Sequence, residues 1–258
     1  KNDNPLHFRS ALESVFDQVE IDFDTRIVVD GVIGDDLKRV LDDFPQIYVS
    51  QLPNSIGLGL ALGEVFKQEI YDKYDIAIRF DADDINYPGR FLSLVDAIVN
   101  EDYDLVGSHV YEINESSQII GERRVPISAS KIKIYKNFFN PFNHPSTAFK
   151  VSVLKSVGGY RHCNFHEDWF LWLHFIKSGF NIGNLNQYLV GFRVNEGTID
   201  RRFGGQYRKH EVNFYIAALS NGLLNPVLGC IGLGLRQLSK LFGRGIFLYL
   251  YRKLRKIS

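Results

Sequence analysis

Three carboxylates lie within four residues in the segment Arg79-Phe-Asp-Ala-Asp-Asp84, directly after an apolar stretch. Two of them, Asp81 and Asp83, are spaced i and i+2 after a predicted strand, so they can share one divalent cation that also takes diphosphate oxygens. Magnesium and manganese suit such hard oxygen ligands. The competing interpretation is an acidic turn that caps a helix beginning near Pro88. Repulsion among three carboxylates disfavours a plain turn, and a bound cation would relieve it.

A second pair of acids, Glu167 and Asp168, begins a helix rich in aromatic residues. Acids in the first turn of a helix usually interact with its dipole. Beside an apolar wall such as Trp169 or Trp172, however, one carboxylate can act as a general base on a hydroxyl. The dipole explains the acids but not the flanking indoles, and both interpretations stay open.

Three further signals are weaker. Asp30, followed by Gly31 at the end of a predicted strand, can accept a hydrogen bond from a base or ribose, or can form a plain turn. Asn54 to Gly59 either lets the backbone approach a nucleotide or simply starts a helix. The loop Asn140 to His144 is rich in groups that can meet hydroxyls or phosphate, and its polarity predicts a place outside the core. The alternative for His144 is that it caps local backbone.

Alternating helices and strands are predicted to position these residues. The predicted helices span 6–18, 35–44, 57–70, 130–139 and 167–179, and the predicted strands span 26–30, 47–52, 75–80 and 104–110, with a hairpin or excursion in 113–125. Such alternation implies an α/β fold with a mostly parallel sheet, which binds ligands at the carboxyl ends of its strands. Asp30 and the acids after residue 80 fall at such ends.

The composition is that of an ordinary folded enzyme, with 258 residues, 45% of them hydrophobic and 23% charged. The simplest expectation is one domain with a terminal appendage. Net charge is zero, but no acid follows Glu211, whereas seven cations do: Arg236, Lys240, Arg244, Arg252, Lys253, Arg255 and Lys256. This split argues against a nucleic-acid-binding body and for a cationic tail that meets an anionic surface. Cys163 and Cys230 match neither a zinc site nor a disulfide framework, which favours a reducing compartment.

Residues 225–258 are predicted to form a basic, amphipathic helical tail. Its apolar residues recur at helical spacing: Leu228, Ile231, Leu235, Leu238, Leu241 and Phe242, followed by the aromatic run Ile246 to Tyr251. Such a segment would lie in a membrane interface rather than cross it. The longest apolar run, Leu223 to Leu235, contains Asn225 and Pro226 and is too short to span a bilayer. The alternative is that these helices pack on the catalytic domain or on a second subunit.

Taken together, the motifs resemble those of bacterial family 2 glycosyltransferases with the GT-A fold, a Rossmann-like α/β fold, and particularly the subgroup of surface polysaccharide synthesis. The resemblance spans about residues 2–210. It is carried by the helix from Ala11 to Gln18, Val29-Asp-Gly31, Asn54 to Leu62, Arg79 to Asp84, Pro88 with Arg90-Phe91, Asn140 to His144, Gly158-Gly-Tyr160, and Glu167-Asp168 with Leu171-Trp172. It implies a catalytic domain over 1–224, in which the first strand is missing or reduced to residues around Asn2 and Asp3.

The resemblance also implies roles for individual residues. For the donor, it assigns Asp30 to the nucleobase, Asn54 to the nucleotide, Asp81 to the ribose or metal, and Asp83 to the metal that bridges the diphosphate. Leu62 stands where many relatives have an arginine, and Arg79 is a candidate to supply that contact. Arg201 and Arg202 are candidates for the basic groups of a late loop. For the acceptor, it implies Asp168 as the base with Glu167 in support, while His144 and Trp169 are candidate contacts.

The function so implied is inverting transfer of a hexose or N-acetylhexosamine, with Mn²⁺ or Mg²⁺, from a nucleotide diphosphate sugar, for which we expect UDP. The acceptor would be a hydroxyl of a glycan or polyprenyl-linked oligosaccharide in O-antigen, capsule or exopolysaccharide synthesis. The location would be cytoplasmic, at the inner face of the bacterial membrane, with a homodimer as a further possibility. A single base opposite the leaving group implies inversion, whereas a hydrolase would need a paired acid and nucleophile. The alternatives are a catalytically inactive nucleotide-sugar or glycan-binding module, and a nucleotidyltransferase, which should show a glycine-rich, arginine-containing loop near the start.

Overall fold

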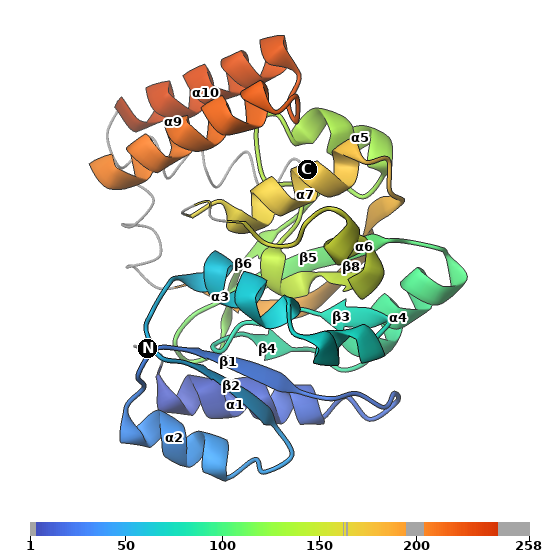
Figure 1. Cartoon of the computed structure of the whole chain (residues 1–258), viewed down its shortest axis with the longest axis vertical. Helices are drawn as coiled ribbons and strands as arrows, with labels where there is room; N and C mark the ends of the chain where they lie inside the picture. The colour runs from blue at the N-terminus through green and yellow to red at the C-terminus, as the bar shows by residue number, and fades with distance from the viewer. Residues whose placement is uncertain (1–3, 162, 164, 195–203, 242–258) are drawn as a thin grey trace.

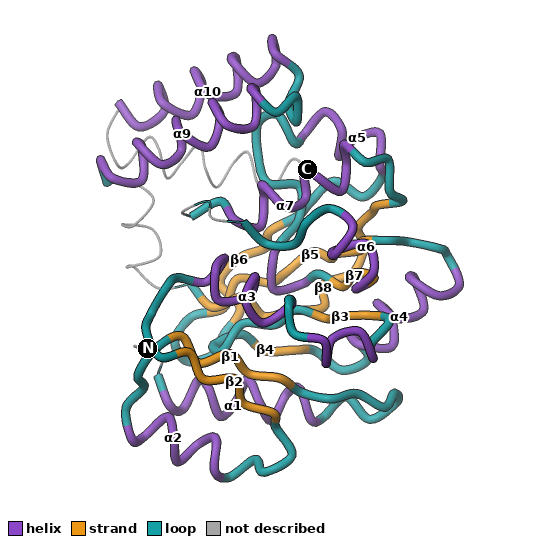
Figure 2. The backbone as a smooth tube through the Cα atoms, in the orientation of Figure 1, coloured by secondary structure: helices purple, strands orange, loops and turns teal. Residues whose placement is uncertain are grey.

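The computed structural model describes residues 4–161, 163, 165–194 and 204–241. The helices are α1 (Pro5–Phe16), α2 (Asp35–Asp42), α3 (Leu58–Phe66), η1 (Glu69–Lys73), α4 (Arg90–Asn100), α5 (Ala129–Tyr135), η2 (His144–Ser146), α6 (Val151–Ser156), α7 (Glu167–Lys177), α9 (Gly205–Ser220) and α10 (Pro226–Leu241). The strands are β1 (Arg26–Asp30), β2 (Tyr48–Leu52), β3 (Ile76–Ile78), β4 (Ile85–Asn86), β5 (Leu105–Ile113), β6 (Ile119–Arg123), β7 (Ala148–Lys150) and β8 (Ile182–Arg193). Figure 2 shows the strands in the interior with helices around them.

Residues 4–52 build a small parallel unit. Asn4 caps α1 by accepting a hydrogen bond from the backbone N–H of Leu6 at 2.9 Å, and Pro5 occupies the first turn, where its missing N–H costs nothing. Strands β1 and β2 pair in parallel over their whole length, with α1 and α2 beside them in Figure 1. Buried apolar side chains form the core of this unit: Phe8, Leu12, Leu37, Val40 and Ile47. β1 therefore holds Asp30 at the carboxyl edge of this sheet.

A second, six-stranded sheet forms the centre, in the order β3-β7-β5-β8-β4 with β6 paired to β5. The expected α/β architecture is confirmed, but the sheet is more mixed than expected. Among the described strands, β1 with β2 and β5 with β8 pair in parallel, whereas β3 with β7, β4 with β8, and β5 with both β6 and β7 pair antiparallel. The expectation of a reduced first strand falls on residues 1–3, outside the described residues.

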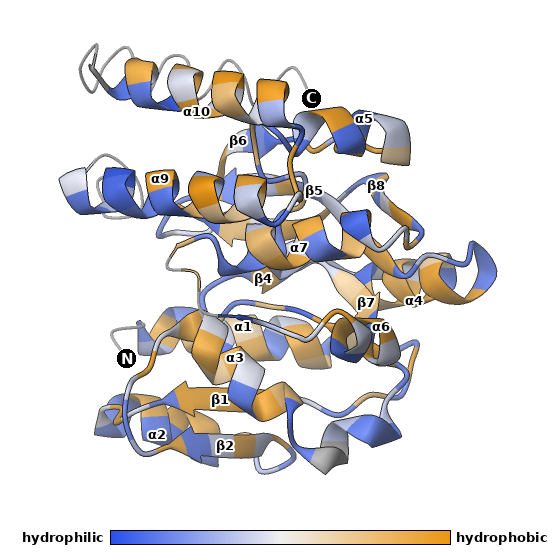
Figure 3. Cartoon of the chain, turned by 45° about the horizontal axis from the view of Figure 1, so that its top comes forward, coloured by the Kyte–Doolittle hydropathy of each residue, from blue (hydrophilic) through white to orange (hydrophobic). Residues whose placement is uncertain are grey.

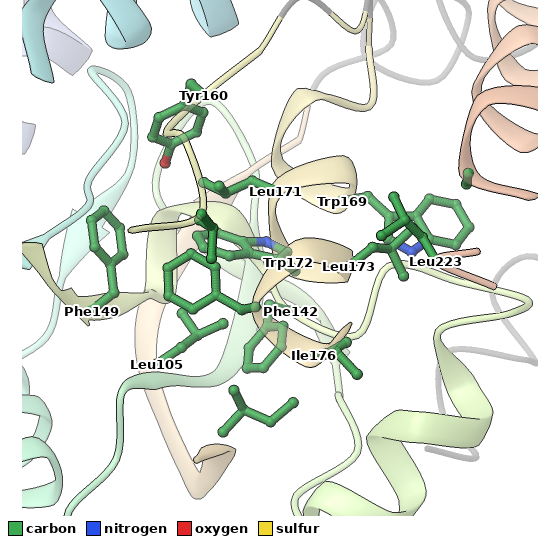
Figure 4. Packing of buried hydrophobic residues seen from close by; sticks show 14 of the residues in the cluster. Leu105, Phe142, Phe149, Tyr160, Trp169, Leu171, Trp172, Leu173, Ile176 and Leu223 are labelled. Carbon is green, nitrogen blue, oxygen red and sulfur yellow. The ribbon is translucent and has the colours of Figure 1, made fainter. Parts of the chain in front are cut away.

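The main core lies between the central sheet and α7. Trp172 is fully buried, with the rings of Phe142 and Phe149 about it at centroid distances of 5.8 and 6.0 Å (Figure 4). The loop Asn140 to His144 contributes to this core, so the expectation that it lies outside was wrong. Its polar groups bond internally instead: the Asn143 amide donates to the carbonyl of Ser108 at 3.0 Å. A polar segment can be core when its hydrogen bonds are made within the protein.

The C-terminal helices α9 and α10 lie side by side next to α7 (Figure 1). The described part of the predicted tail is therefore packed on the rest of the chain, as the alternative interpretation had it. α10 still presents an apolar stripe outward, in which Val227, Ile231, Leu235 and Leu238 are 67%, 48%, 58% and 51% exposed. Figure 3 shows α10 as a band of alternating hydrophobic and hydrophilic residues. Residues 242–258, with five of the seven cations, lie outside the described residues.

Candidate active site

One pocket of about 1140 Å³ gathers most of the residues singled out from the sequence. Its lining includes Asp30, Arg79, Asp81, Asp83, His144, Glu167, Asp168 and Trp169. Asn54 is exposed and does not line it, and Arg201 and Arg202 lie outside the described residues. Small-molecule sites usually measure about 300–1,000 Å³. The pocket thus has room for more than one small ligand, and it joins the acids after β3 to those that begin α7.

In the segment after β3, Asp81 and Asp83 line the pocket, whereas Asp84 does not. The start of this segment is fixed because the backbone N–H of Arg79 donates to the carbonyl of Thr147 at 2.8 Å, which extends the pairing of β3 with β7. The Arg79 guanidinium pairs with the Asp81 carboxylate. Asp84 instead points inward and is 1% exposed, with one carboxylate oxygen accepting the backbone N–H of Arg193 at 2.8 Å. Burial raises the pKa of Asp84 well above its ordinary value, and the negative charges of Asp81 and Asp83 add to the shift.

Asp81 and Asp83 fit a divalent cation that is shared with a ligand. Both line the pocket, and the Asp81 side chain keeps 27% of its surface exposed even while paired with Arg79. Within the described ranges, no group of three or more histidine, cysteine, aspartate or glutamate side chains is placed to hold a metal by itself. Magnesium sites of one or two carboxylates are completed by water and substrate phosphates. The donor set fits that type of site, and Arg79 would compete with the cation for Asp81.

Asp30 anchors the start of α3. Its carboxylate accepts hydrogen bonds from the backbone N–H groups of Ile56 at 2.7 Å and Gly57 at 2.9 Å, and from the hydroxyl of Ser55 at 3.0 Å. Gly31 permits this close approach: it has a φ of +88°, and an added Cβ would lie 2.9 Å from the backbone nitrogen of Ser55. A carboxylate has about four acceptor positions. Three are already used, so Asp30 can offer a ligand roughly one more.

The acids that begin α7 have distinct surroundings. The Asn140 amide donates to one oxygen of Asp168 at 2.6 Å and so fixes the direction of that carboxylate. Glu167 lies against α3, since a Cβ added at Gly59 would come within 2.7 Å of its Cβ. Burial, reinforced by the negative charge of Asp168, raises the pKa of Glu167 to about 7. Near neutral pH, Glu167 can therefore be protonated, which suits a supporting role.

Two predicted acceptor contacts are largely closed off by packing. The His144 ring is bonded through Nε2 to the hydroxyl of Tyr160 at 2.9 Å, and burial, with the positive charge of Arg79, lowers the pKa of His144 well below its ordinary value. His144 is thus neutral, and its ring does not cap local backbone. Trp169 is 2% exposed, with the rings of Phe214 and Tyr215 at centroid distances of 4.5 and 5.8 Å. It forms part of the pocket wall.

Three pocket residues escaped the sequence reasoning. Asn140 lay in a flagged loop, and its proximity to Asp168 depends on packing between segments 28 residues apart. Phe165 lines the pocket, is 49% exposed and has a φ of +65°, a strained conformation of the kind found at functional sites. Its only signal in the sequence was its place two residues before Glu167. Arg236 was counted as a tail cation, and nothing local indicated that it lines the pocket.

The chain is similar in sequence to known glycosyltransferases over most of its length. The model of the Glycosyl transferase family 2 matches residues 6–158. A galactosyltransferase of Escherichia coli, the UDP-Gal:alpha-D-GlcNAc-diphosphoundecaprenol beta-1,3-galactosyltransferase, is 34% identical over 81% of this chain and 77% of its own. An uncharacterized glycosyltransferase of Haemophilus influenzae is 31% identical over 97% of this chain and 94% of its own. The amylovoran biosynthesis glycosyltransferase of Erwinia amylovora is 28% identical over 98% of this chain and 96% of its own.

Solved structures show the same fold at low sequence identity. A mannosyltransferase from Pyrobaculum calidifontis in complex with GDP-Man and Mn²⁺ gives a TM-score of 0.65 at 12% identity, over 95% of this chain and 70% of that one. TarS of S. aureus in complex with UDP-GlcNAc gives a TM-score of 0.64 at 14% sequence identity, and the match covers 91% of this chain and 68% of that one. The fold is therefore GT-A. The family match and the named relatives make the chain a glycosyltransferase enzyme. The chain belongs to glycosyltransferase family 2.

Proposed function

We propose that this enzyme transfers a hexose or N-acetylhexosamine, with inversion, from a UDP-sugar to a hydroxyl of a glycan or lipid-linked oligosaccharide in the synthesis of a surface polysaccharide. The observation that carries the proposal is one pocket lined both by Asp81 and Asp83 and by Glu167 and Asp168. The first pair suits a cation with the diphosphate of a donor, and the second suits an acceptor hydroxyl. Sugar transfer needs both groups at a single site.

The relatives support each half of this assignment. Two of the similar proteins are named for the biosynthesis of a polysaccharide, amylovoran in one case and O-antigen in the other. A third is named for transfer from UDP-Gal to a diphosphoundecaprenol-linked sugar. Both solved structures described above carry a nucleotide sugar, and one of them carries Mn²⁺. We infer a UDP donor, a Mn²⁺ or Mg²⁺ cofactor and a polyprenyl-linked acceptor for this chain.

The proposed mechanism divides between the two ends of the pocket. Asp81 and Asp83 would hold the cation, which when bound neutralises the charge that develops on the departing nucleoside diphosphate. Asp168, held by Asn140, accepts the proton of the acceptor hydroxyl. The hydroxyl oxygen bonds to the anomeric carbon as the bond from that carbon to the phosphate oxygen breaks. The single displacement inverts the anomeric centre, so an α-linked donor gives a β-linked product.

We further propose that the protein works at the inner, cytoplasmic face of the bacterial membrane, where a lipid-linked acceptor would be presented. No helix in the described part of the chain has the length and apolarity needed to cross a bilayer. The exposed stripe on α10 and the cations after it would make a peripheral contact. The same stripe could instead join two subunits, and the two outcomes are separable by experiment.

Release of free nucleoside diphosphate tests the reaction class. Candidate nucleotide sugars would first be screened with Mn²⁺ by thermal shift, because a ligand that binds only the folded state raises the melting temperature. A stabilising donor should then release its nucleoside diphosphate faster when an acceptor is present. Donor binding without acceptor-stimulated release would favour the inactive binding module, and release of pyrophosphate from a nucleoside triphosphate would indicate a nucleotidyltransferase.

A further inference from the structure

A buried charge cluster fixes α10 on α9. Glu211 of α9 has no exposed surface, and its carboxylate accepts from Arg236 Nε at 2.7 Å, Gln237 Nε2 at 2.7 Å and Lys240 Nζ at 2.5 Å. Burial alone would raise the pKa of Glu211, but the charges of Arg236 and Lys240 outweigh it and hold that pKa below its ordinary value. A buried carboxylate is tolerated only when it is fully paired in this way. The cluster therefore sets the position of Arg236 along the pocket wall.

From this position Arg236 reaches the turn that follows α5. Its Nη1 donates to the carbonyl of Phe138 at 3.2 Å, and its guanidinium lies 5.7 Å from the ring centroid of Phe139. Gly232, one helical turn earlier, makes the approach possible, because an added Cβ would lie only 2.2 Å from the carbonyl oxygen of Asn137. α10 is thus pressed against residues 137–139.

This turn leads directly to the proposed catalytic base. Two residues after Phe138, the Asn140 amide donates to Asp168 at 2.6 Å. Arg236 also contacts α7 itself, since its guanidinium lies 5.4 Å from the ring centroid of Trp169, the residue after Asp168. Two separate contacts of one side chain therefore converge on the same carboxylate, one through the backbone before Asn140 and one through the neighbouring indole.

We propose that Arg236 is a positioning residue, which acts through Asn140 and Trp169 to hold Asp168 in line with the acceptor hydroxyl. The inference rests on the proposed role of Asp168 as the base. It makes α10 part of the machinery for transfer, in addition to any membrane contact. Small displacements of a catalytic group slow a reaction by as much as about a hundredfold.

The test compares Arg236→Met with Arg208→Met. Arg208 of α9 joins the same two helices by donating to Gln237 Oε1 at 3.2 Å, but it does not line the pocket. We expect Arg236→Met to lower kcat on the order of tenfold or more, with the donor affinity in Mn²⁺ and the KM for donor unchanged, and Arg208→Met to retain its kcat. Equal losses of kcat in both variants, or a loss of donor affinity that matches the loss of kcat, would show a merely structural role.

A fold check and a further variant keep the test decisive. Arg236→Met leaves the buried Glu211 carboxylate paired with Lys240, so circular dichroism and thermal unfolding should show that the variant is folded while its kcat is lowered. In Asn140→Ala, adding Arg236→Met should lower kcat by clearly less than it does alone, because the route through Asn140 is already broken. Full additivity of the two losses overturns the proposal.

Asp168→Asn separates this proposal from the proposed function. An active Asp168→Asn variant means that the base has been misassigned, whatever Arg236 does. An inactive Asp168→Asn variant together with an unaffected Arg236→Met variant means that the base is right and the positioning role is wrong.

Discussion

At the scale of single residues, acids close together in the sequence have different surroundings. Asp81 and Asp83 line the pocket, whereas Asp84 turns inward and bonds to the backbone of Arg193. Asp30, which the sequence suggested as a hydrogen-bond acceptor for a nucleobase, already accepts three hydrogen bonds from residues 55–57. Residue type and spacing identified the cluster, but the packing of β8 on β4 determines which carboxylates line the pocket.

The first prediction at this scale concerns the cation. Asp83→Asn should abolish transfer while leaving the fold intact, because an amide is a much weaker ligand than a carboxylate for Mn²⁺ or Mg²⁺. The measurement is nucleoside diphosphate release against Mn²⁺ concentration, with circular dichroism to check the fold. Asp36→Asn is the control, since Asp36 lies on the exposed face of α2 and should keep full activity. An Asp83→Asn variant that is fully active in the presence of chelator would refute the metal role.

The second prediction concerns the base. Asp168→Asn should leave donor binding nearly unchanged but lower the transfer rate by roughly a hundredfold or more, the usual size of a general-base effect. Single-turnover transfer and donor binding by calorimetry would be measured on the same preparation. Should Glu167→Gln prove to be the inactive variant and Asp168→Asn the active one, the roles of the two acids are reversed.

The third prediction follows from the raised pKa of Glu167. An acid whose pKa rises on folding holds its proton more tightly in the folded state, so its contribution to stability is full below the unfolded pKa and is lost as pH rises through the folded one. For Glu167 this window runs from 4.5 to about 7. The shift corresponds to about 3 kcal/mol.

Urea unfolding at pH 5 and pH 8 measures this contribution. The free energy of unfolding should fall between the two pH values in the wild-type protein, and it should fall clearly less in Glu167→Gln. Acids distant from Glu167 contribute equally in both proteins, so the difference between them reports Glu167 together with its interaction with the Asp168 charge. An identical pH dependence in the two proteins would mean that Glu167 is not protonated in the folded state.

At the scale of elements, α3 packs against α7 where Glu167 lines the pocket. Gly59→Ala should push the two helices apart, because the new Cβ would lie 2.7 Å from the Cβ of Glu167. We expect a loss of about 1–3 kcal/mol in unfolding free energy and slower transfer. Gly234→Ala in α10 is the matched control, since nothing lies within 4 Å of its added Cβ, and it should gain up to about 1 kcal/mol from helix propensity. If Gly59→Ala were equally stabilising, the close approach would be wrong.

Local pattern predicted most of the elements that are defined by their own residues. The first three helices and first three strands follow from apolar spacing over short windows, and the structure places them within a few residues of the expected ranges. β7 and β8 were missed because their place depends on partners far away in the sequence: β7 pairs with β3 and β5, and β8 pairs with β4 and β5. The antiparallel pairings of β3 with β7, β5 with β7 and β4 with β8, beside the parallel pairing of β5 with β8, make the sheet mixed.

The same limit applied to the site. Asp81, Asp83, Glu167 and Asp168 could be found because each pair is local, and the pocket brings the two pairs together. Asn140 and Arg236 could not, since the contact of Asn140 with Asp168 spans 28 residues and that of Arg236 with Glu211 spans 25. The loop Asn140 to His144 was wrongly predicted to lie outside the core, because polar composition does not reveal whether hydrogen bonds are made to water or to protein.

At the scale of the whole molecule, α10 has one face in the pocket wall and another face exposed. The inner face carries Arg236 and Lys240, both committed to Glu211, so these two cations are not available to a membrane. Five cations remain after Leu241 in the sequence: Arg244, Arg252, Lys253, Arg255 and Lys256. Together with the exposed apolar stripe, they make the proposed contact partly electrostatic and partly apolar, and each part has its own response to salt.

Three of the four stripe residues can be changed without disturbing the pocket, whereas the fourth, Leu235, lines it. Val227→Gln, Ile231→Gln and Leu238→Gln change side chains that are 67%, 48% and 51% exposed, and none of the three lines the pocket. Truncation at Asn225 would be a poor test, because it would strip Glu211 of its partners. A matched control changes Val99, Ile119 and Ile120 to Gln, residues on α4 and β6 that are 64%, 58% and 59% exposed.

Co-sedimentation with anionic and neutral vesicles, at low and high salt, then separates the possibilities. Losing about 1 kcal/mol of apolar burial at each position should weaken adsorption of the stripe variant to anionic vesicles by roughly a hundredfold, while the control variant binds like the wild type. High salt should weaken the wild type further, because it screens the remaining cations. No binding of the wild type to anionic vesicles at low salt, or equal binding of all three proteins, would exclude the stripe as a membrane contact. Sedimentation velocity of the same proteins would then show whether the stripe joins two subunits, since a dimer formed through it should dissociate in the stripe variant and persist in the control.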